Sequence, residues 1–410
     1  MAKNKLMGNI VSLFTLKGAE YIISFITLPY LLRVLGPDKY GAITFAQVIM
    51  NYGILLVDYG FNLTAPRDIA KADKGDVSRH FAAIMGAKFI LLVPILCLGV
   101  ILLTVFQANI DIWLILCVLP LLLGNVLFPI WYFQGIQQMQ FITVFNLLAR
   151  TVSVLAIFIL IRSTADYRLA AFLQSIVPLL AGIISLIVLW RRSRELFCLP
   201  KWQDVISKFK DGWDIFISTL FINLYTNSNI FILGILTNDT VVGYYSAANK
   251  LIEAVKGLLT PISNAIFPHV SVLFKESKVK AIKFLCKVMH ILGCGSFSIS
   301  LMVFILAEPI VHLVMGEAYR ESVLILRIIS FLPFIIGLSN IFGIQTMVAF
   351  CMQRIFSRIL MISAIVNFVL VFPMVMLWQG LGLAITVVIV ECFVTITMYV
   401  TLIKHNIVIK

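Results

Sequence analysis

Three lysines lie inside stretches of this chain that are otherwise apolar enough to cross a bilayer. They are Lys17, Lys250 and Lys256. A charge at bilayer depth is costly and persists where it faces a water-filled cavity or a charged partner. Hydrogen bonding between helices does not explain these lysines, because an ammonium group in lipid stays charged when only neutral groups accept its hydrogen bonds. The lysines therefore predict a polar cavity that suits an anionic substrate.

Two arginines, Arg150 and Arg327, also fall within predicted spans and add to the positive charge. For these two an alternative stays open, in which each braces its own helix bundle through backbone carbonyls. Lys88 and Lys287 lie near span ends, and we expect them to extend toward the lipid headgroups.

Three carboxylates accompany the cations. Glu20 lies one helical turn from Lys17, and Glu253 lies one turn from both Lys250 and Lys256, so partial neutralisation is available. Asp58 is the third carboxylate. Each is a candidate for carrying a coupling proton, and a static role as the partner of a lysine is the alternative.

Neutral polar residues recur at three- and four-residue spacing in several spans, which places them on single helical faces. The predicted cavity-lining residues are Thr44, Gln47, Asn51, Asn62, Asn223, Asn227, Asn249 and Asn264. Hydrogen bonding between helices is the alternative role for such side chains. Stripes in several spans at once favour a common cavity.

The elements that carry these residues are membrane helices. Of the 410 residues, 61% are hydrophobic and 12% are charged, with a mean hydropathy of +1.04, whereas soluble domains carry about 25% charged residues. At about 20 residues a span, the chain has room for about twelve spans. We predict an all-α polytopic membrane protein with spans at 9–33, 41–62, 82–105, 112–133, 142–162, 169–190, 213–236, 243–267, 284–306, 322–345, 355–377 and 381–403.

The distribution of basic residues predicts the orientation. With twelve spans and a cytoplasmic N-terminus, 20 of the 32 lysines and arginines fall in cytoplasmic segments and five on the opposite face. This bias is typical of the positive-inside rule and places both termini in the cytoplasm. The formal net charge of +13 therefore reports membrane topology, and no nucleic-acid partner is expected.

The chain is expected to form two six-helix lobes, residues 1–190 and 213–410, joined by a basic cytoplasmic linker at 191–212. An offset of 202 residues aligns Gly41 with Gly243 and Pro66 with Pro268. Two such repeats would be related by an axis along the membrane normal, with a substrate site between them.

Signatures of the common enzyme classes are absent from the sequence. It has no Gly-Lys dipeptide for a phosphate-binding loop and no Asp-x-Asp pair for a metal-bound nucleotide sugar. The seven cysteines include no C-x-x-C pair, and the histidines are scattered. We expect no enzyme, no metal and no cofactor, although coupling to a proton or sodium gradient stays open. The alternatives are a cation or drug antiporter, favoured by Asp58 and Glu20, and a membrane-embedded polymerase or ligase, whose large outer loop is missing.

Four segments resemble bacterial O-antigen flippases of the Wzx type, in the polysaccharide transporter branch of the superfamily that includes the MATE exporters. They read L-G-P-D-K-Y-G (35–41), Y-G-F-N-L-T-A-P-R-D-I-A-K (59–71), F-P-I-W-Y-F-Q-G-I-Q-Q-M-Q (128–140) and G-Y-Y-S-A-A-N (243–249). The resemblance implies a bacterial inner-membrane protein that moves an undecaprenyl-pyrophosphate-linked oligosaccharide between leaflets for lipopolysaccharide biosynthesis. It also implies contact with membrane lipids and with polymerase and chain-length components of the same pathway.

Overall fold

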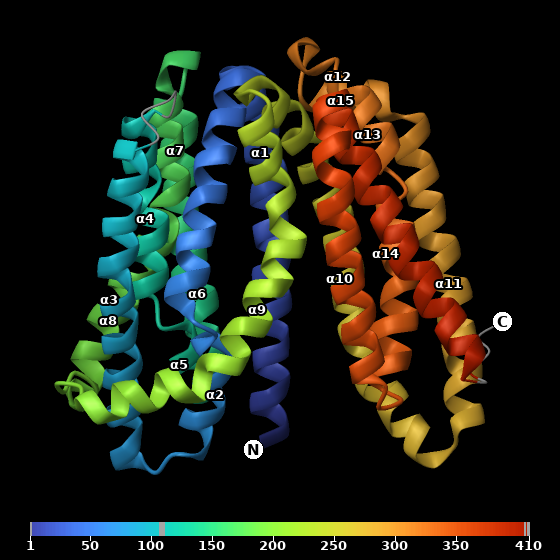
Figure 1. The fold of residues 1–410 in the computed structure, drawn as a ribbon. Coiled ribbons are helices and arrows are strands. Elements are labelled where there is room, and N and C mark those ends of the chain that lie inside the picture. The colour runs from blue at the N-terminus through green and yellow to red at the C-terminus, as the bar shows by residue number, and fades with distance from the viewer. Residues whose placement is uncertain (1, 106–110, 406, 408–410) are drawn as a thin grey trace. The chain divides into compact units, whose positions relative to one another are not determined.

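The computed structural model describes residues 2–105, 111–405 and 407. Within these residues, side chains are described except for 2–22, 24–25, 74, 102–105, 218, 221–222, 224–227, 258–262, 264–265, 268–269, 271 and 275. The part of the chain so described is almost entirely helical (Figure 1). This confirms the all-α membrane class.

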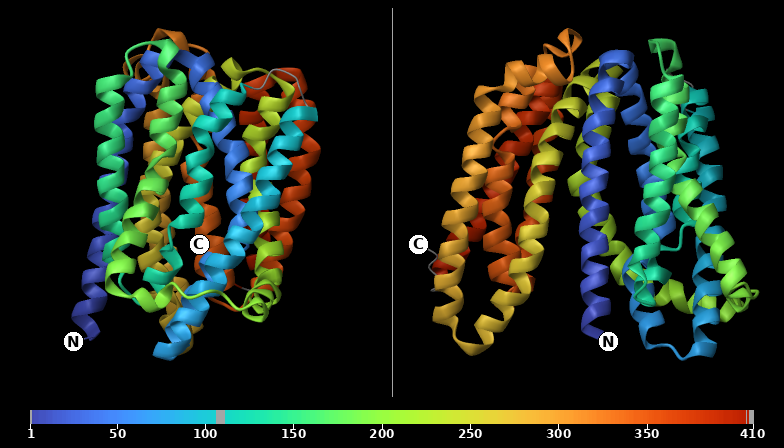
Figure 2. Two further views of the ribbon diagram at one scale, coloured as in Figure 1. Left: turned by 90° about the vertical axis from the view of Figure 1, so that its left-hand side faces the viewer. Right: turned by 180° about the vertical axis from the view of Figure 1, so that it is seen from behind.

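The chain divides into two compact units. Unit 1 comprises Met1–Leu35 and Ile43–Thr226, and unit 2 comprises Gly36–Ala42 and Asn227–Lys410. Within each unit most helices run side by side along one direction (Figures 1 and 2). The assignment of the chain to lobes at 1–190 and 213–410 stays a prediction.

Unit 1 is built mainly from α1 (Ala2–Asp58), α2 (Phe61–Lys71), α3 (Lys74–Val105), α4 (Ile112–Leu127), α5 (Ile130–Gly135), α6 (Met139–Leu160), α7 (Tyr167–Ser175), α8 (Val177–Arg192) and α9 (Trp202–Leu236). Short 3₁₀ turns lie at Thr164–Asp166 and Arg194–Leu196. Trp131 and Phe133 of the W-Y-F-Q-G segment are 0% and 1% exposed at the centre of its core. That segment therefore packs the interior of unit 1.

Unit 2 contains most of its residues in α10 (Asp239–Glu276), α11 (Lys278–Ile305), α12 (Ala307–Val314), α13 (Ser322–Ile329), α14 (Leu332–Asn340), a π-helix (Ile341–Val348) and α15 (Gln353–Lys404). A 3₁₀ turn lies at Glu317–Tyr319. Its core gathers around Val270, Leu285 and Phe342.

Helices overlie each of the twelve predicted ranges. Among the described residues, eight helices are long and apolar enough to cross a membrane. Two of these eight are long kinked stretches, so this number is not a count of crossings, and the figure of twelve stays a prediction.

The breaks between helices follow from local backbone chemistry. Gly36 has φ +71°, a conformation that glycine adopts without strain, and Pro37 follows it at a position where a missing N–H costs no hydrogen bond. This break lies between the predicted spans 9–33 and 41–62. In α15, Trp378 and Gln379 leave helical geometry between the predicted spans 355–377 and 381–403.

Two predicted spans are interrupted where the sequence pattern showed continuous helix. The span at 41–62 ends early, because Tyr59 (φ 48°) and Gly60 (φ 78°) turn the chain before α2 begins. The span at 112–133 breaks at Phe128, which precedes Pro129 and is held out of helical geometry by the proline ring.

Candidate functional site

The predicted cavity residues are distributed over both units, and the structure describes most of their side chains. Lys17, Glu20, Asn227 and Asn264 lie outside the residues whose side chains are described. Their placement in a cavity stays a prediction.

The cationic face of α10 is described best. Lys256 Nζ lies 2.5 Å from Glu253 Oε1, and their side chains are 25% and 50% exposed. Lys250, on the same helix, is exposed, and Asn249 is half-buried. Glu253 thus pairs with Lys256, and Lys250 lies one helical turn before Glu253 on the same helix.

The two arginines lie on different helices. Arg327 of α13 pairs with Glu308 at the start of α12, with Nη2 and Oε2 3.6 Å apart. Arg150 is half-buried on α6. The contact joins α12 and α13 within unit 2, and substrate binding by Arg327 stays a prediction.

Asp58 forms an ion pair inside unit 1. Its Oδ1 accepts a hydrogen bond from Lys88 Nζ at 3.2 Å. The Lys88 side chain is 2% exposed, and that of Asp58 is 19% exposed. The expectation that Lys88 extends to the headgroups is therefore wrong, because the ammonium group is held within the protein by the carboxylate that ends α1. Lys287, the other lysine in that expectation, is exposed.

The structure gives the hydrogen bonds or the exposure of several neutral polar residues, and their role in lining a cavity stays a prediction. Gln47 donates a weak hydrogen bond to Gln174 Oε1 of α7 at 3.5 Å, and Asn223 donates to the Thr219 carbonyl of its own helix at 2.9 Å. Asn51 is exposed, whereas Thr44 is buried. The Oδ1 atom of Asn62 is buried without a hydrogen-bond partner among the described residues.

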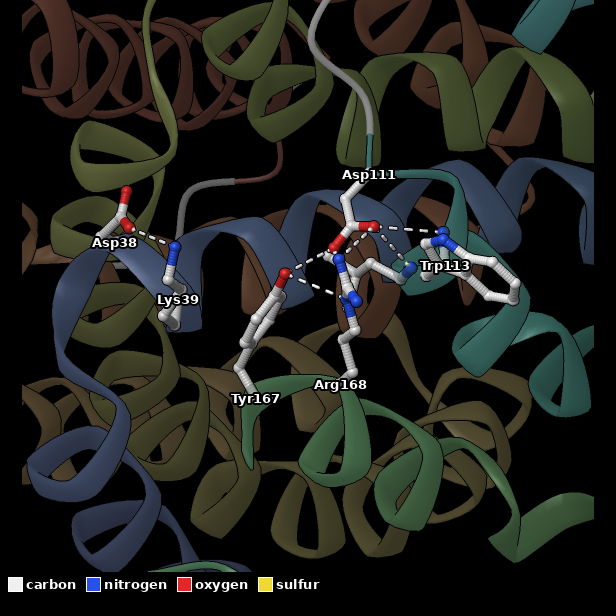
Figure 3. Close-up of polar contacts among 7 residues, drawn as sticks. Asp38, Lys39, Asp111, Trp113, Tyr167 and Arg168 are labelled. Atoms are coloured by element: carbon white, nitrogen blue, oxygen red, sulfur yellow. Dashed lines mark hydrogen bonds and ion pairs between the residues drawn. The ribbon is translucent and has the colours of Figure 1, made fainter. Parts of the chain in front are cut away.

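A polar cluster that the sequence interpretation missed is centred on Asp111, at the start of α4 (Figure 3). Asp111 accepts hydrogen bonds from the backbone N–H groups of Trp113 and Leu114 at 3.1 and 3.3 Å. It also accepts from the Tyr167 hydroxyl at 2.6 Å and from Arg168 Nε and Nη2 at 2.9 and 3.1 Å. The same carboxylate thus caps α4 and ties it to α7. An aspartate directly before an apolar run was the available signal.

The Asp111 cluster gives a pH-dependent contribution to stability. Partial burial raises the pKa of Asp111, but hydrogen bonds from Tyr167 and Arg168 outweigh it, and the pKa lies below its usual value. A lowered folded-state pKa stabilises the protein above the unfolded-state pKa of about 4, and this contribution is lost as the pH falls through the folded-state value. Asp111→Asn is therefore expected to lower the melting temperature at pH 7, with the difference from wild type shrinking below about pH 4.

Thermal unfolding of the purified protein across this pH range checks the expectation. Glu195→Gln is a matched control, since that carboxylate is exposed. The expectation is contradicted if the melting temperatures of the Asp111→Asn variant and wild type differ by the same amount from pH 7 down to pH 2.5, roughly 1.5 units below the ordinary aspartate pKa.

The Asp38–Lys39 ion pair, at 3.0 Å, is a separate surface contact (Figure 3).

No group of three or more histidine, cysteine, aspartate or glutamate residues that could hold a metal ion occurs in the described part of the chain. Within the described part of the chain, Asp58 and Glu253 each lie within ion-pair distance of a lysine, and anion binding by the cations stays a prediction.

Comparisons with known proteins agree with this architecture. The family described as polysaccharide biosynthesis protein matches residues 6–274. A protein of Escherichia coli K12 named "Putative O-antigen transporter" is 36% identical over 399 residues, covering 97% of this chain and 96% of its own. A protein of Shigella dysenteriae with the same name is 29% identical, covering 95% and 98%.

Solved structures match in fold. An inward-facing multidrug resistance MATE family transporter of the MOP superfamily aligns with a TM-score of 0.71 at 13% identity, covering 94% of each chain. The lipid II flippase MurJ in an inward closed conformation aligns with a TM-score of 0.70 at 12% identity, covering 97% of this chain and 87% of its own. This multi-pass membrane protein has the fold of the MOP superfamily transporters, and it belongs to the polysaccharide biosynthesis protein family.

Proposed function

We propose that this protein is a flippase that moves an undecaprenyl-pyrophosphate-linked oligosaccharide, the O-antigen repeat unit, across the bacterial inner membrane. The observation that carries the proposal is the 36% identity to an Escherichia coli relative named as an O-antigen transporter, over 97% of this chain. In this proposal, both termini lie in the cytoplasm and lipid-linked glycan is the substrate. Polymerase and chain-length components of the same pathway would act on the product.

The cationic residues supply the chemistry that such a substrate requires. A pyrophosphate is the compulsory anion of the lipid-linked glycan, and lysine binds phosphate groups as a compact point charge. Lys250 and Lys256 of α10, with Lys17 of α1, are the proposed binding residues. Arg150 and Arg327 have the weaker claim, because the Glu308 contact already accounts for Arg327.

Alternating exposure of the polar pathway to the two membrane faces is the proposed mechanism. The oligosaccharide and pyrophosphate would follow the polar residues while the polyprenyl tail stays in lipid. Glu20, Asp58 and Glu253 are the carboxylates available for coupling to a proton or sodium gradient. No cofactor or catalytic residue enters this scheme.

The competing proposal is a MATE-type cation or drug antiporter, since the fold is shared with a MATE transporter at a TM-score of 0.71. A cation exporter needs acidic residues that attract its substrate. Two of the three candidate carboxylates are instead engaged by lysines, Asp58 by Lys88 and Glu253 by Lys256. These pairings leave less negative charge to attract a cation and weigh against the antiporter.

The flippase proposal is tested by removing the gene from its host. The expected result is loss of surface polysaccharide and accumulation of one lipid-linked oligosaccharide in the cytoplasmic leaflet. Restored export on return of the gene is the control. A deletion strain with unchanged surface polysaccharide and raised sensitivity to cationic drugs would support the antiporter instead.

The lysine site is tested in the same strain. The Lys17→Ala, Lys250→Ala, Lys256→Ala triple variant is expected to lower export by about tenfold or more, because hydrogen bonds to charged groups contribute ~1.5–3 kcal/mol each. The corresponding Lys→Arg variant should keep partial activity, since the charge is retained. Surface polysaccharide and membrane protein level are measured together.

The matched control for the triple variant removes three exposed lysines elsewhere, Lys278, Lys283 and Lys404, and so changes the net charge equally. Export close to wild type is expected from the control. Full export by the Lys17, Lys250, Lys256 variant would show that these lysines do not bind the substrate.

A further inference from the structure

The first part of α9, residues 202–213, is here called the transverse segment, because it runs across the ends of α2 and α3, whereas residues 214–226 run along the other helices of unit 1 (Figures 1 and 2). Two ion pairs fix it there. Lys208 Nζ lies 2.6 Å from Asp68 Oδ2 of α2. Arg79 of α3 donates to both carboxylate oxygens of Asp204, at 2.7 and 3.2 Å. The transverse segment is thus a fixed part of unit 1.

Aromatic packing holds the bend where α9 turns. The Tyr59 ring stacks on Phe216, with centroids 4.5 Å apart and planes at 9°, and meets Phe209 edge-on at 5.2 Å. Gly212 provides the room for this contact, because a Cβ there would lie 3.2 Å from the Tyr59 ring. The orientation of the transverse segment is therefore defined at both ends.

This orientation leaves an apolar stripe uncovered. Trp202, Ile206 and Trp213 are 65%, 37% and 53% exposed, and their spacing of four and seven residues places them on one helical face. Val205 and Lys208, which lie outside this stripe, are buried against unit 1. A helix in contact with the protein on one face and exposing large apolar side chains on another needs a second apolar surface.

The neighbouring sequence indicates what that surface is. The helical stretch Thr164–Arg192 is long and apolar enough to span a membrane, and it ends in exposed Trp190, Arg191 and Arg192. At its other end the transverse segment leads, after Trp213, into an apolar run at 215–236. Both ends of the segment are thus bounded by membrane helices, and tryptophan beside basic residues is typical of the membrane–water interface.

Outside its two ion pairs with unit 1, the segment together with Lys201 just before it carries the exposed charged residues Lys201, Lys210 and Asp211, which give a net charge of +1. Lys208 and Asp204 are engaged by Asp68 and Arg79. Lys201 and Lys210 flank the apolar stripe, whereas Asp211 accepts a hydrogen bond from Ser207 Oγ at 3.3 Å. A basic rim beside exposed tryptophans fits an anionic headgroup above an acyl layer.

We propose that Lys201 and the first part of α9, residues 202–213, form an interfacial segment that binds anionic phospholipid, with Lys201 and Lys210 on the headgroups and Trp202, Ile206 and Trp213 in the acyl boundary. This anchoring is independent of the transported substrate. It holds the junction between the membrane helices α8 and α9 at the membrane surface.

Fluorescence quenching by brominated lipids tests the proposal on the full-length protein. The protein is reconstituted in phosphatidylcholine vesicles that contain either phosphatidylglycerol or phosphatidylcholine brominated near the headgroup end of the acyl chains. Subtracting the quenching of the Trp202→Phe, Trp213→Phe variant isolates the signal of the two segment tryptophans. We expect half-maximal quenching at a severalfold lower fraction of brominated phosphatidylglycerol than of brominated phosphatidylcholine.

Replacing the flanking lysines should remove this preference. Each lysine near an anionic surface contributes about 1 kcal/mol, or roughly fivefold, so the Lys201→Gln, Lys210→Gln variant should quench almost equally with both lipids. The matched control, Lys278→Gln with Lys283→Gln, changes the net charge equally at exposed positions of α11 and should keep the wild-type preference.

Measurements on the wild-type protein alone test both the preference for anionic lipid and the interfacial position of the segment. Equal quenching by the two lipids overturns the anionic-lipid site. Quenching of the segment tryptophans by aqueous iodide and by neither lipid overturns the interfacial position, and indicates solvent or a protein partner on this face. A preference that survives in the Lys201→Gln, Lys210→Gln variant overturns the assignment to these lysines.

Discussion

Replacement of Lys88 by methionine is expected to destabilise the protein strongly, by about 3–5 kcal/mol, because breaking a buried ion pair leaves an uncompensated charge. The Lys88 side chain is 2% exposed and its Nζ lies 3.2 Å from Asp58 Oδ1. Without the ammonium group, water could solvate the Asp58 carboxylate only through the 19% of its side chain that is exposed. Thermal unfolding of the purified protein and its level in the membrane measure the loss.

The partner variants separate a structural role from a coupling role. Asp58→Asn alone should also destabilise, since it leaves the Lys88 ammonium group buried beside a neutral amide. The double variant Asp58→Asn, Lys88→Met should recover most of the stability, because replacing both members of a buried pair is often close to neutral. Lys287→Met is the matched control, as Lys287 is exposed on α11 and should change stability by less than about 0.5 kcal/mol.

Export by the stable double variant then tests proton coupling at Asp58. If Asp58 carries a coupling proton, the double variant is folded and inserted but exports poorly, and the pH dependence of export changes. Wild-type export with unchanged pH dependence assigns the pair to the structure alone. A Lys88→Met variant as stable as wild type would show that the buried pair does not form.

Much of the helix pattern follows from the sequence because apolar runs and helix-breaking residues are local signals. The breaks at Gly36 and at Trp378–Gln379 fall in gaps between predicted spans. The turn at Tyr59–Gly60 was missed because tyrosine rarely adopts a positive φ and gives no sign of it. The Tyr59 ring is held by stacking on Phe216, a contact across more than 150 residues of chain.

The partners of charged residues were less predictable. Glu253 and Lys256 are one turn apart on the same helix, so their pairing follows from sequence spacing. Lys88 and Asp58 lie on different helices, and hydropathy does not show which faces of two helices meet. The same limit applies to Asp111 with Arg168 and to Asp68 with Lys208, which tertiary packing alone brings together.

One long-range feature was foreshadowed by the sequence offset of 202 residues. Gly41 and Gly243, which this offset aligns, lie at one crossing of α1 and α10 within unit 2. A Cβ on Gly41 would overlap the Asp239 carbonyl oxygen, and a Cβ on Gly243 would overlap the Pro37 carbonyl oxygen. Since the same offset relates Pro37 to Asp239, the two contacts are equivalent. The aligned glycines thus mark a reciprocal close approach of two helix backbones.

Substitution at this crossing should have a large effect at either position. Gly41→Ala and Gly243→Ala each place a methyl group on backbone atoms, which cannot rotate away as a side chain can. Overpacking of this kind costs about 1–3 kcal/mol. Each variant should therefore unfold at a lower temperature than wild type, and export should fall with the level of folded protein. Thermal unfolding in detergent and membrane protein level provide the measurement.

The double variant and a matched glycine make the test specific to the crossing. Gly295→Ala, on α11, adds a Cβ with nothing within 4 Å and should leave stability unchanged or raise it by up to about 1 kcal/mol, the helix propensity gained. When the two helices move apart to accommodate one methyl group, the same movement makes room for the other. The Gly41→Ala, Gly243→Ala double variant should therefore lose less stability than the two single variants added together. Fully additive losses would mean that the two glycines act at independent sites. Single variants as stable as Gly295→Ala would mean that the backbones do not approach at this crossing.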